Sequence, residues 1–262
     1  MHSITYSVRF VALLSFFAVS TTLAASPALA VTVFSETFGG YTHFPSQFPA
    51  GDPINFGEPL QSEGADNDWY GGRFEVPDAP INSDPIEDIR LDIGVQQIAG
   101  GTGEGPVARV GDDAGILFKV DLTAATAATL TFDWRMFLAG SNDDLVVGYH
   151  VGDDLGFDAS TPVIDFVEQE GGQANVVNWW NNNWTEVHRG NDGNAWQTET
   201  NISLAVGDVV WVAFWIDNGD SDFAKIDNII VDATLVPEPG TALLLGLGLA
   251  GLATRRSATK TA

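Results

Sequence analysis

The chain has 262 residues and a formal charge of −24, from 35 acidic and 11 basic residues, and it contains no cysteine. The lack of cysteine excludes disulfides, thiolate metal sites and cysteine nucleophiles. A chain this acidic repels phosphate backbones, which argues against nucleic acid as a partner, and it offers many oxygen ligands to hard cations.

Residues 1–30 have the order of a secretory signal peptide. Arg9 precedes an apolar stretch at residues 10–20, and Ala28 and Ala30 are small residues of the kind that signal peptidase recognises. The pattern predicts cleavage after Ala30 and export of the rest of the chain. The alternative is a buried N-terminal helix, which does not explain why the three regions occur in this order.

Residues 31–235 form the predicted domain and show no sustained helical period. Leu130–Leu138 alternates apolar and polar residues, as a half-buried strand does, and residues 208–216 (DVVWVAFWI) predict a central strand covered on both faces. Further strand patterns occur at 31–38, 89–98, 116–122, 144–151, 162–169, 184–188, 195–204 and 224–236. About ten strands between turn-rich segments predict an all-β fold, an antiparallel β-sandwich of the jelly-roll type.

Residues 39–68 interrupt this pattern. The segment has four prolines, five glycines and no clear period. Long loops of this kind are often functional or disordered, and this one is predicted to cap one end of the sandwich.

The second half of the domain resembles a known family. LTFDWRM, WTEV, the stretch from Trp196 to Phe214 and AKIDNIIVDA together resemble the MAM-like jelly-roll domains of bacterial surface proteins, over about residues 114–234. The resemblance implies a fold, and a role as an adhesion or binding module, more than it implies a ligand.

A calcium site is predicted between the first and last strands, which lie side by side in a jelly roll. Glu36 lies in the first strand and Asp227 in the last. The resemblance to carbohydrate-binding jelly rolls implies a structural Ca²⁺ between such residues and backbone carbonyls, which supply the oxygen ligands that calcium needs. The alternative is that both are ordinary strand or turn residues.

Four tryptophans are candidates for carbohydrate binding: Trp179, Trp180, Trp184 and Trp196. Exposed indole faces stack on sugar rings, and the neighbouring asparagines offer amides to sugar hydroxyls. The alternative is that most of these rings belong to the core, because tryptophan is highly buried on average.

No catalytic motif is recognised in the predicted domain. Its histidines, His43, His150 and His188, form neither H-E-x-x-H nor a close cluster in sequence, so a zinc hydrolase is not supported. Carboxylate pairs such as Glu168 and Glu170 are what a glycosidase needs, but so acidic a chain offers such pairs by chance. We therefore predict a protein that is not an enzyme, with a secreted glycan hydrolase as the less favoured alternative.

The last segment, residues 236–262, differs from the acidic domain before it. Residues 241–254 carry no charge and include six leucines, and Arg255 and Arg256 follow. As a helix these 14 residues reach about 21 Å, short of a bilayer core of about 30 Å, and the basic end favours the cytoplasmic side. Pro237-Glu238-Pro239 before the run is held extended by its prolines. The segment predicts a short transmembrane anchor.

Pro237-Glu238-Pro239, the apolar run and Arg255-Arg256 together resemble the PEP-CTERM sorting signal of exported bacterial proteins. The resemblance implies processing by exosortase, a membrane enzyme, after transient anchoring in the inner membrane. It also implies a destination at the cell surface or in the exopolysaccharide matrix of Gram-negative, biofilm-forming bacteria. The predicted function is a non-catalytic surface or matrix protein; the alternative is a carbohydrate-binding or adhesion module that contacts exopolysaccharide.

Overall fold

The computed structural model describes most of the predicted domain. The described residues are 29–39, 67–75, 93–97, 106–111, 114–137, 143–158, 161–191, 195–217, 223–236, 246 and 248–249. The predicted signal peptide up to residue 28, most of the predicted loop at 39–68 and most of the C-terminal segment lie outside them.

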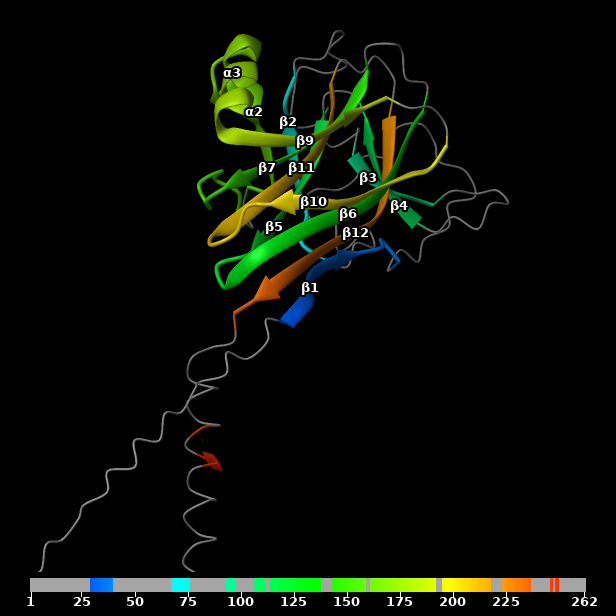
Figure 1. Ribbon diagram of the computed structural model, residues 1–262. Coiled ribbons are helices and arrows are strands. Elements are labelled where there is room, and N and C mark those ends of the chain that lie inside the picture. The colour runs from blue at the N-terminus through cyan, green and yellow to red at the C-terminus, as the bar shows by residue number, and fades with distance from the viewer. Residues whose placement is uncertain are drawn as a thin grey trace, which may run out of the picture.

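The described strands form two six-stranded sheets (Figure 1). Sheet A has the order β10-β6-β12-β4-β3, with β1 also paired to β12, and sheet B has the order β8-β2-β5-β11-β7-β9. The strands of sheet A are β1 (Leu29–Glu36), β3 (Ile93–Gln97), β4 (Pro106–Gly111), β6 (Ala125–Phe137), β10 (Gln197–Leu204) and β12 (Phe223–Leu235). Those of sheet B are β2 (Tyr70–Arg73), β5 (Ala114–Asp121), β7 (Asp144–Val151), β8 (Val163–Asp165), β9 (Trp184–Gly190) and β11 (Val209–Asp217).

These pairings confirm the predicted β-sandwich. Every described pair of strands is antiparallel except β2 with β8, which is parallel. The first and last strands are antiparallel neighbours, with Leu29 opposite Leu235 and Glu36 opposite Ile229. The expectation that these two strands lie side by side is therefore confirmed.

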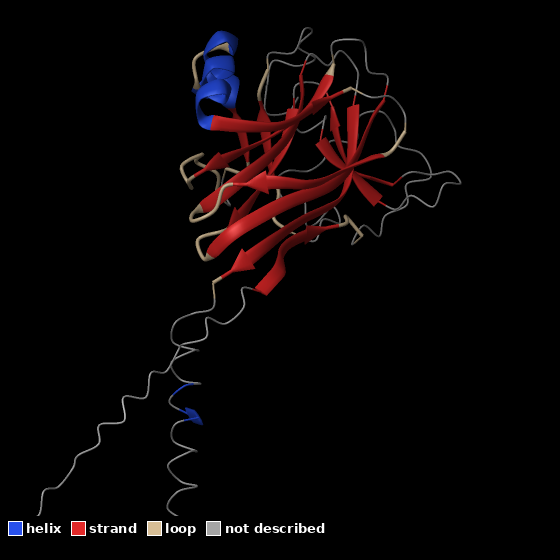
Figure 2. Cartoon of the chain, viewed as in Figure 1, coloured by secondary structure: helices blue, strands red, loops and turns tan. Residues whose placement is uncertain are grey.

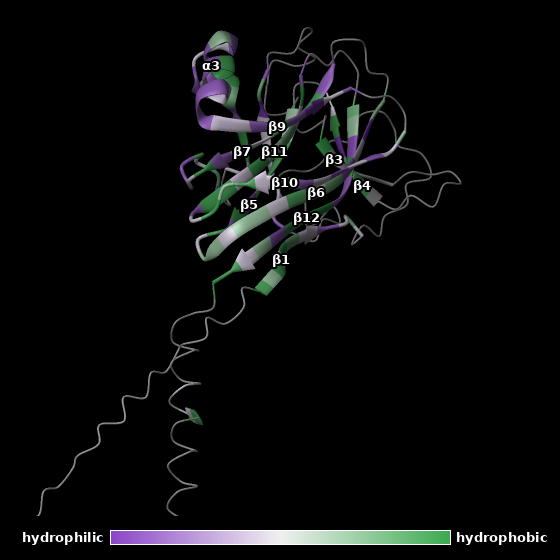
Figure 3. Ribbon diagram, viewed as in Figure 1, coloured by the Kyte–Doolittle hydropathy of each residue, from purple (hydrophilic) through white to green (hydrophobic). Residues whose placement is uncertain are grey.

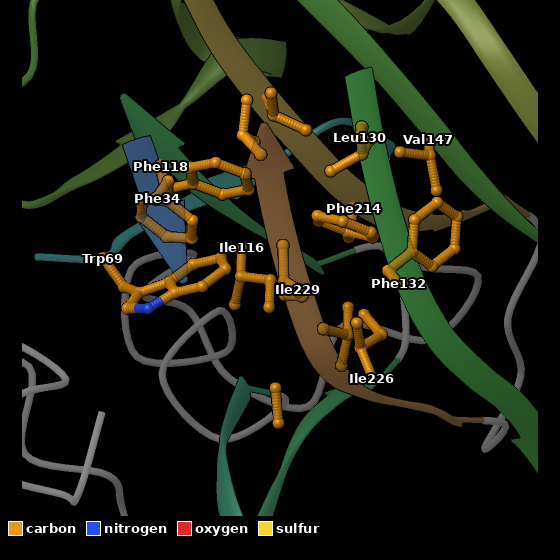
Figure 4. Close-up of a cluster of buried hydrophobic side chains, with 14 of the residues drawn as sticks. Phe34, Trp69, Ile116, Phe118, Leu130, Phe132, Val147, Phe214, Ile226 and Ile229 are labelled. Carbon is orange, nitrogen blue, oxygen red and sulfur yellow. The ribbon is translucent and has the colours of Figure 1, made fainter. Parts of the chain in front are cut away.

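The main core lies between the sheets, and strand alternation builds it. On β6 the buried residues Leu130, Phe132 and Trp134 alternate with half-buried ones, so one face of the strand points inward. Aromatic rings from several strands meet there; Phe34 of β1 stacks on Phe118 of β5 with ring centroids 4.0 Å apart (Figure 4).

A second core covers the outer face of sheet B. On β11, Val212 and Phe214 join the main core, whereas Trp211 and Trp215 point the other way into a cluster of aromatic rings. Two helices close this cluster, α2 (Phe166–Gln169) and α3 (Gln173–Asn183), which lie together at one end of the molecule (Figure 2). The prediction that residues 208–216 form a strand covered on both faces is confirmed.

The helices correct two predictions. The strand predicted at 162–169 ends at Asp165, whose side chain accepts the N–H of Glu168 and begins α2. The predicted lack of helix is wrong at α3, which buries only Val176 and Trp180 and whose other residues are mostly polar (Figure 3). Two buried positions in 11 residues leave too weak a helical period to detect, and asparagine is a poor helix former.

Candidate functional site

Three rows of side chains cross the outer face of sheet A, the face turned away from sheet B. The register of β12 on β6 places Asp227 opposite Asp133, Lys225 opposite Arg135, and Phe223 opposite Phe137. Because strand side chains alternate between faces, residues two apart share one face. A carboxylate row, a cation row and an aromatic row therefore follow one another along both strands.

The cation row continues onto the neighbouring strands. Arg109 of β4 lies opposite Lys225, and the guanidinium of Arg135 lies over the ring of Trp196, 5.0 Å from its centroid. We call Arg109, Arg135, Trp196 and Lys225, with the Phe137–Phe223 pair, the basic–aromatic patch.

Aromatic rings hold the cations of the patch in place. The rings of Phe137 and Phe223 stack with centroids 4.9 Å apart. The Lys225 ammonium lies 4.4 Å and the Arg135 guanidinium 4.3 Å from the Phe137 centroid, and the Arg109 guanidinium lies 4.9 Å from that of Phe223. Each of these is a cation–π contact, which stabilises a cation held away from water. Lys225 is buried, and Arg109 and Arg135 are half-buried.

The carboxylate row is fixed by a bulge in β12. The register shifts between Asp227 and Ile230, and Asn228 adopts a positive φ of 49° there. Its side-chain amide then donates to Asp133 at 2.7 Å, and the Thr198 hydroxyl of β10 donates to the same carboxylate at 2.6 Å. The bulge thus turns an amide toward the carboxylates.

The pKa of Asp227 is raised to about 6, first by burial and then by the charges of Asp133 and Glu36, against the opposing hydrogen bond from the Asn228 N–H. Because the pKa in the folded state lies above the unfolded value of 3.8, protonation favours folding. This contribution to stability is present below about pH 4 and is lost as the pH rises through about 6.

We expect Asp227→Asn to raise the free energy of unfolding at pH 7.5 by about 1–2 kcal/mol, discounted for partial exposure, because the neutral amide avoids burying a charge. The gain should shrink at pH 5. Urea unfolding of both proteins at the two pH values measures this difference, with the exposed Asp232→Asn on the same strand as the control. A gain equal at both pH values, or a loss at pH 7.5, would contradict the raised pKa.

Glu36 is a fully buried carboxylate at the end of β1. It accepts the Phe38 N–H at 2.7 Å, the Asn67 N–H at 2.9 Å, the Asn67 side-chain amide at 3.0 Å and the Trp69 indole N–H at 3.1 Å. These donors come from two segments about 30 residues apart in sequence, so the carboxylate ties the chain before β2 to β1.

This arrangement bears on the predicted calcium site. The structure places Glu36 and Asp227 on paired strands, near enough for the charge of Glu36 to affect Asp227. One N–H donates to Oε1 of Glu36 and three donate to Oε2. Within the described ranges, no three His, Cys, Asp or Glu side chains are grouped to hold a metal ion, whereas the predicted site has two carboxylates and backbone carbonyls. The described donors make Glu36 a hydrogen-bonded carboxylate, and calcium between Glu36 and Asp227 stays a prediction.

The four tryptophans predicted to bind sugar are separated by the fold. Trp180 and Trp184 are 5% and 6% exposed and stack on each other with centroids 4.7 Å apart. As a correction, these two rings belong to the second core and have no free face for a sugar. Trp179 is half-buried against Phe166, and Trp196 is half-buried over Arg135 in the basic–aromatic patch.

A pocket of about 500 Å³ lies beside α2. Its most buried polar group is Asp165, which accepts the Arg73 Nε–H at 3.0 Å, pairs with Arg73 Nη2, and accepts the Glu168 N–H. Both oxygens of this carboxylate are already used, so Asp165 holds Arg73 and α2 in place. Its other lining residues are Gly156, Thr161, Val163, Ile164, Glu168 and Gln169.

Sequence analysis missed most of the basic–aromatic patch. Arg109, Arg135 and Lys225 are single cations in separate strand patterns, and only the register of β4, β12 and β6 brings them into one row. A detectable signal existed at Arg135, a long cation on the polar side of a strongly alternating strand. Asn67 was missed because it lies at the end of an aperiodic segment.

The predicted sorting residues Pro237, Glu238, Pro239, Arg255 and Arg256 lie outside the described residues. Over the part of the chain that is described, no helix has the length and apolar character needed to cross a bilayer.

Comparison with solved structures finds weak similarity to several binding domains. The C-terminal family 22 carbohydrate-binding module of Clostridium thermocellum Xyn10B is 11% identical, with a TM-score of 0.40 over 79% of this chain and 96% of that one. The K3 cleaved adhesin domain of Lys-gingipain from Porphyromonas gingivalis is 13% identical, with a TM-score of 0.38 over 78% and 98%. TmCBM61, solved with β-1,4-galactotriose, is 10% identical, with a TM-score of 0.34 over 62% and 86%. The β-sandwich is established by the strand pairing described above. TM-scores of 0.34–0.40 carry no argument about ligands.

The C-terminal segment has a specific match. Residues 235–257 match the PEP-CTERM protein-sorting motif, and that range contains the Pro-Glu-Pro triplet, the apolar run and the two arginines. A search of curated proteins gives no match to the chain. The chain therefore carries a PEP-CTERM sorting motif and is an exported, exosortase-processed surface protein with a β-sandwich body.

Proposed function

We propose that this protein is a non-catalytic module of the bacterial surface or exopolysaccharide matrix, and that it holds acidic polysaccharide on the basic–aromatic patch. The observation that carries the proposal is the cross-strand row Arg109–Lys225–Arg135 on a chain of charge −24. Anchoring in the inner membrane through residues 241–254, before exosortase processing, is part of the proposal.

Electrostatics support this choice of ligand. The row Arg109–Lys225–Arg135 gathers three cations on neighbouring strands, and such a cluster attracts the carboxylate or sulfate groups of a polysaccharide. At physiological ionic strength the field of acids farther than about 8 Å is screened, so the cation row and the neighbouring carboxylate row set the field at the patch.

The neighbouring groups suit the rest of a sugar. The Thr198 hydroxyl, which donates its hydrogen to Asp133, has an oxygen that can accept a sugar hydroxyl one row from the cations. Trp196 offers an aromatic surface at the side of the patch formed by β10. Charged, hydroxyl-binding and aromatic groups are thus within a few residues of one another on a single face.

We expect Arg135→Ala to weaken binding of uronate-containing polysaccharide about 10-fold, because one charge-assisted contact contributes about 1.5–3 kcal/mol. Lys119→Ala is the matched control, because Lys119 also lies over an indole ring, that of Trp211, but on sheet B. Titration calorimetry against acidic and neutral polysaccharides measures the affinities. Absence of binding to any acidic polysaccharide, or equal loss in both variants, would refute the proposal.

A second candidate, a glycan hydrolase, is favoured by the carboxylate row. Burial raises the pKa of Asp227, which lies opposite Asp133, and glycosidases act through a pair of carboxyl groups. Release of reducing ends from a bound polysaccharide, abolished in Asp227→Asn, would establish this candidate. Binding without such release supports the non-catalytic module.

A further inference from the structure

One end of the sandwich brings together both ends of the described body. Leu29 at the start of β1 lies opposite Leu235 at the end of β12, and the Val236 N–H donates to the Ala124 carbonyl at 3.2 Å. In Figure 1 these strand ends lie together, away from α2 and α3.

Two turns complete this end. The turn at 122–125 joins β5 to β6, and the turn at 205–208 joins β10 to β11. The Leu122 carbonyl accepts the Gly207 N–H at 3.0 Å, and the Leu122 N–H donates to the Asp208 carbonyl at 3.0 Å. We call these two turns, with Val151 and Val236, the anchor end.

Exposed apolar side chains concentrate at the anchor end. Among the described residues six large apolar side chains are exposed, and four of them, Leu29, Val151, Val206 and Val236, lie here at 65%, 43%, 38% and 53% exposure. Val151 belongs to this end because the next N–H, that of Gly152, donates to the Val209 carbonyl beside the 205–208 turn. Cleavage after Ala30 would remove Leu29 and leave the three valines.

The sequence after Val236 leaves little distance between this end and a membrane. The uncharged run begins at residue 241, five residues beyond Val236. Five fully extended residues span at most about 18 Å, and the headgroup layer itself is about 5–8 Å deep. When the run lies in the hydrocarbon, the anchor end is therefore within about 13 Å of the headgroups.

Hydrophobic mismatch shortens that distance further. A helix of 14 residues covers about 21 Å of a hydrocarbon core about 30 Å thick. A short span is accommodated by thinning the bilayer and by drawing flanking residues toward it. On the outer side such a pull acts on Val236, whose N–H donates to the Ala124 carbonyl of the sandwich.

From these observations we infer that the anchor end is a membrane-contact surface, whose valines rest on zwitterionic lipid headgroups of the inner membrane while the tail holds the chain. The inference rests on the proposed anchoring. Asp121 and Asp208 are exposed at this end, and residues 121–125, 205–208 and 235–236 contain no cation. Anionic lipid is therefore repelled, and neutral headgroups are the favoured partner.

The basic–aromatic patch lies farther along the strands that meet at this end. β6 begins and β12 ends at the anchor end, whereas Lys225 lies ten residues before Leu235. At about 3.3 Å per strand residue, the cation row lies about 33 Å along β12 from the anchor end. The basic–aromatic patch is therefore separate from the contact surface.

The test uses the full chain, which has no cysteine, so that single cysteines accept a fluorophore selectively. Val206→Cys labels the anchor end, and Val177→Cys, at 47% exposure on α3, is the matched control. The chain is reconstituted in phosphatidylethanolamine–phosphatidylcholine nanodiscs that contain headgroup-nitroxide lipid. We expect several-fold stronger quenching at position 206 than at 177, and weaker quenching when phosphatidylglycerol is added. Equal quenching at both positions would overturn the inference.

Two further variants separate the causes. Leu247→Cys reports whether the tail inserts into the bilayer, where acyl-chain nitroxides quench it. If position 247 is quenched but position 206 is not, the membrane contact of the anchor end is overturned and the anchoring stands. If position 247 is not quenched, the anchoring is overturned as well. Ten Gly/Ser residues inserted before Pro237 should abolish quenching at 206, because they add about 17 Å of flexible chain. Contact that appears only in membranes containing the processing enzyme would assign this end to a protein partner instead. Polysaccharide binding, measured separately, is unaffected by any of these outcomes.

Discussion

Replacing Glu36 with alanine is expected to lower the free energy of unfolding by about 3–5 kcal/mol, one of the largest effects of any single substitution in the described chain. The carboxylate is fully buried and accepts four hydrogen bonds, from Phe38, Asn67 and Trp69. Alanine leaves these donors without an acceptor, and each unsatisfied buried group costs about 1–3 kcal/mol before the structure relaxes. Urea unfolding followed by tryptophan fluorescence gives the change.

The exposed Asp232→Asn, whose carboxylate accepts only the Thr32 hydroxyl among the hydrogen bonds described for it, is the control and should change stability by less than about 0.5 kcal/mol. Repeating the measurement with a chelator tests the predicted calcium site in the same experiment. If a cation holds Glu36 and Asp227, EDTA lowers the melting temperature of the parent but not that of Glu36→Ala. A loss below about 1 kcal/mol in Glu36→Ala would show that the hydrogen bonds described here do not stabilise the fold.

Trp180→Ala is expected to cost about 3–5 kcal/mol, because it opens a cavity in the second core. Trp180 stacks on Trp184 and packs edge-on against Phe74 and Trp215, at centroid distances of 5.4 and 5.3 Å. A methyl group on Gly148 would approach the same indole to 2.7 Å, so β7 is built around this ring.

The neighbouring Trp179→Ala is the matched control, since it lies on the same helix but is only half-buried. Its cost should be clearly smaller, and polysaccharide affinity should be unchanged in Trp180→Ala wherever the variant remains folded. Equal destabilisation by both substitutions would contradict the burial of Trp180. If folded Trp180→Ala lost polysaccharide binding, the prediction that Trp180 stacks on a sugar ring would be supported after all.

The sandwich was predictable because most of its strands carry a strong pattern. Residues 130–138 alternate cleanly, and residues 208–216 are apolar on both faces because sheet B has a core on each side. Such patterns depend only on local sequence. The two helices escaped prediction because α3 rests on the sandwich through few buried side chains, and tertiary packing rather than helical periodicity holds it there.

The candidate site was less predictable, because register decides it. The cation row exists only where β4, β12 and β6 align Arg109, Lys225 and Arg135, and a shift of one residue would turn each side chain to the other face. The bulge at Asn228 sets the alignment of the carboxylates and has no strong signal in sequence. Glu36 and Asp227 were placed on neighbouring strands correctly, whereas the donors around Glu36 come from residues that no pattern connects to it.

The pairing of β1 with β12 has a consequence for export. Thr32 and Asp232, which share a hydrogen bond, are separated by 200 residues, so the first strand has no β12 partner until almost the whole body has been translocated. An unpaired strand edge is a template for aggregation, and contacts this remote in sequence form slowly. Sheet A can therefore be completed only after β12, the strand directly before the sorting motif, has crossed the membrane. Until then the edge of β1 is open to pairing with other chains.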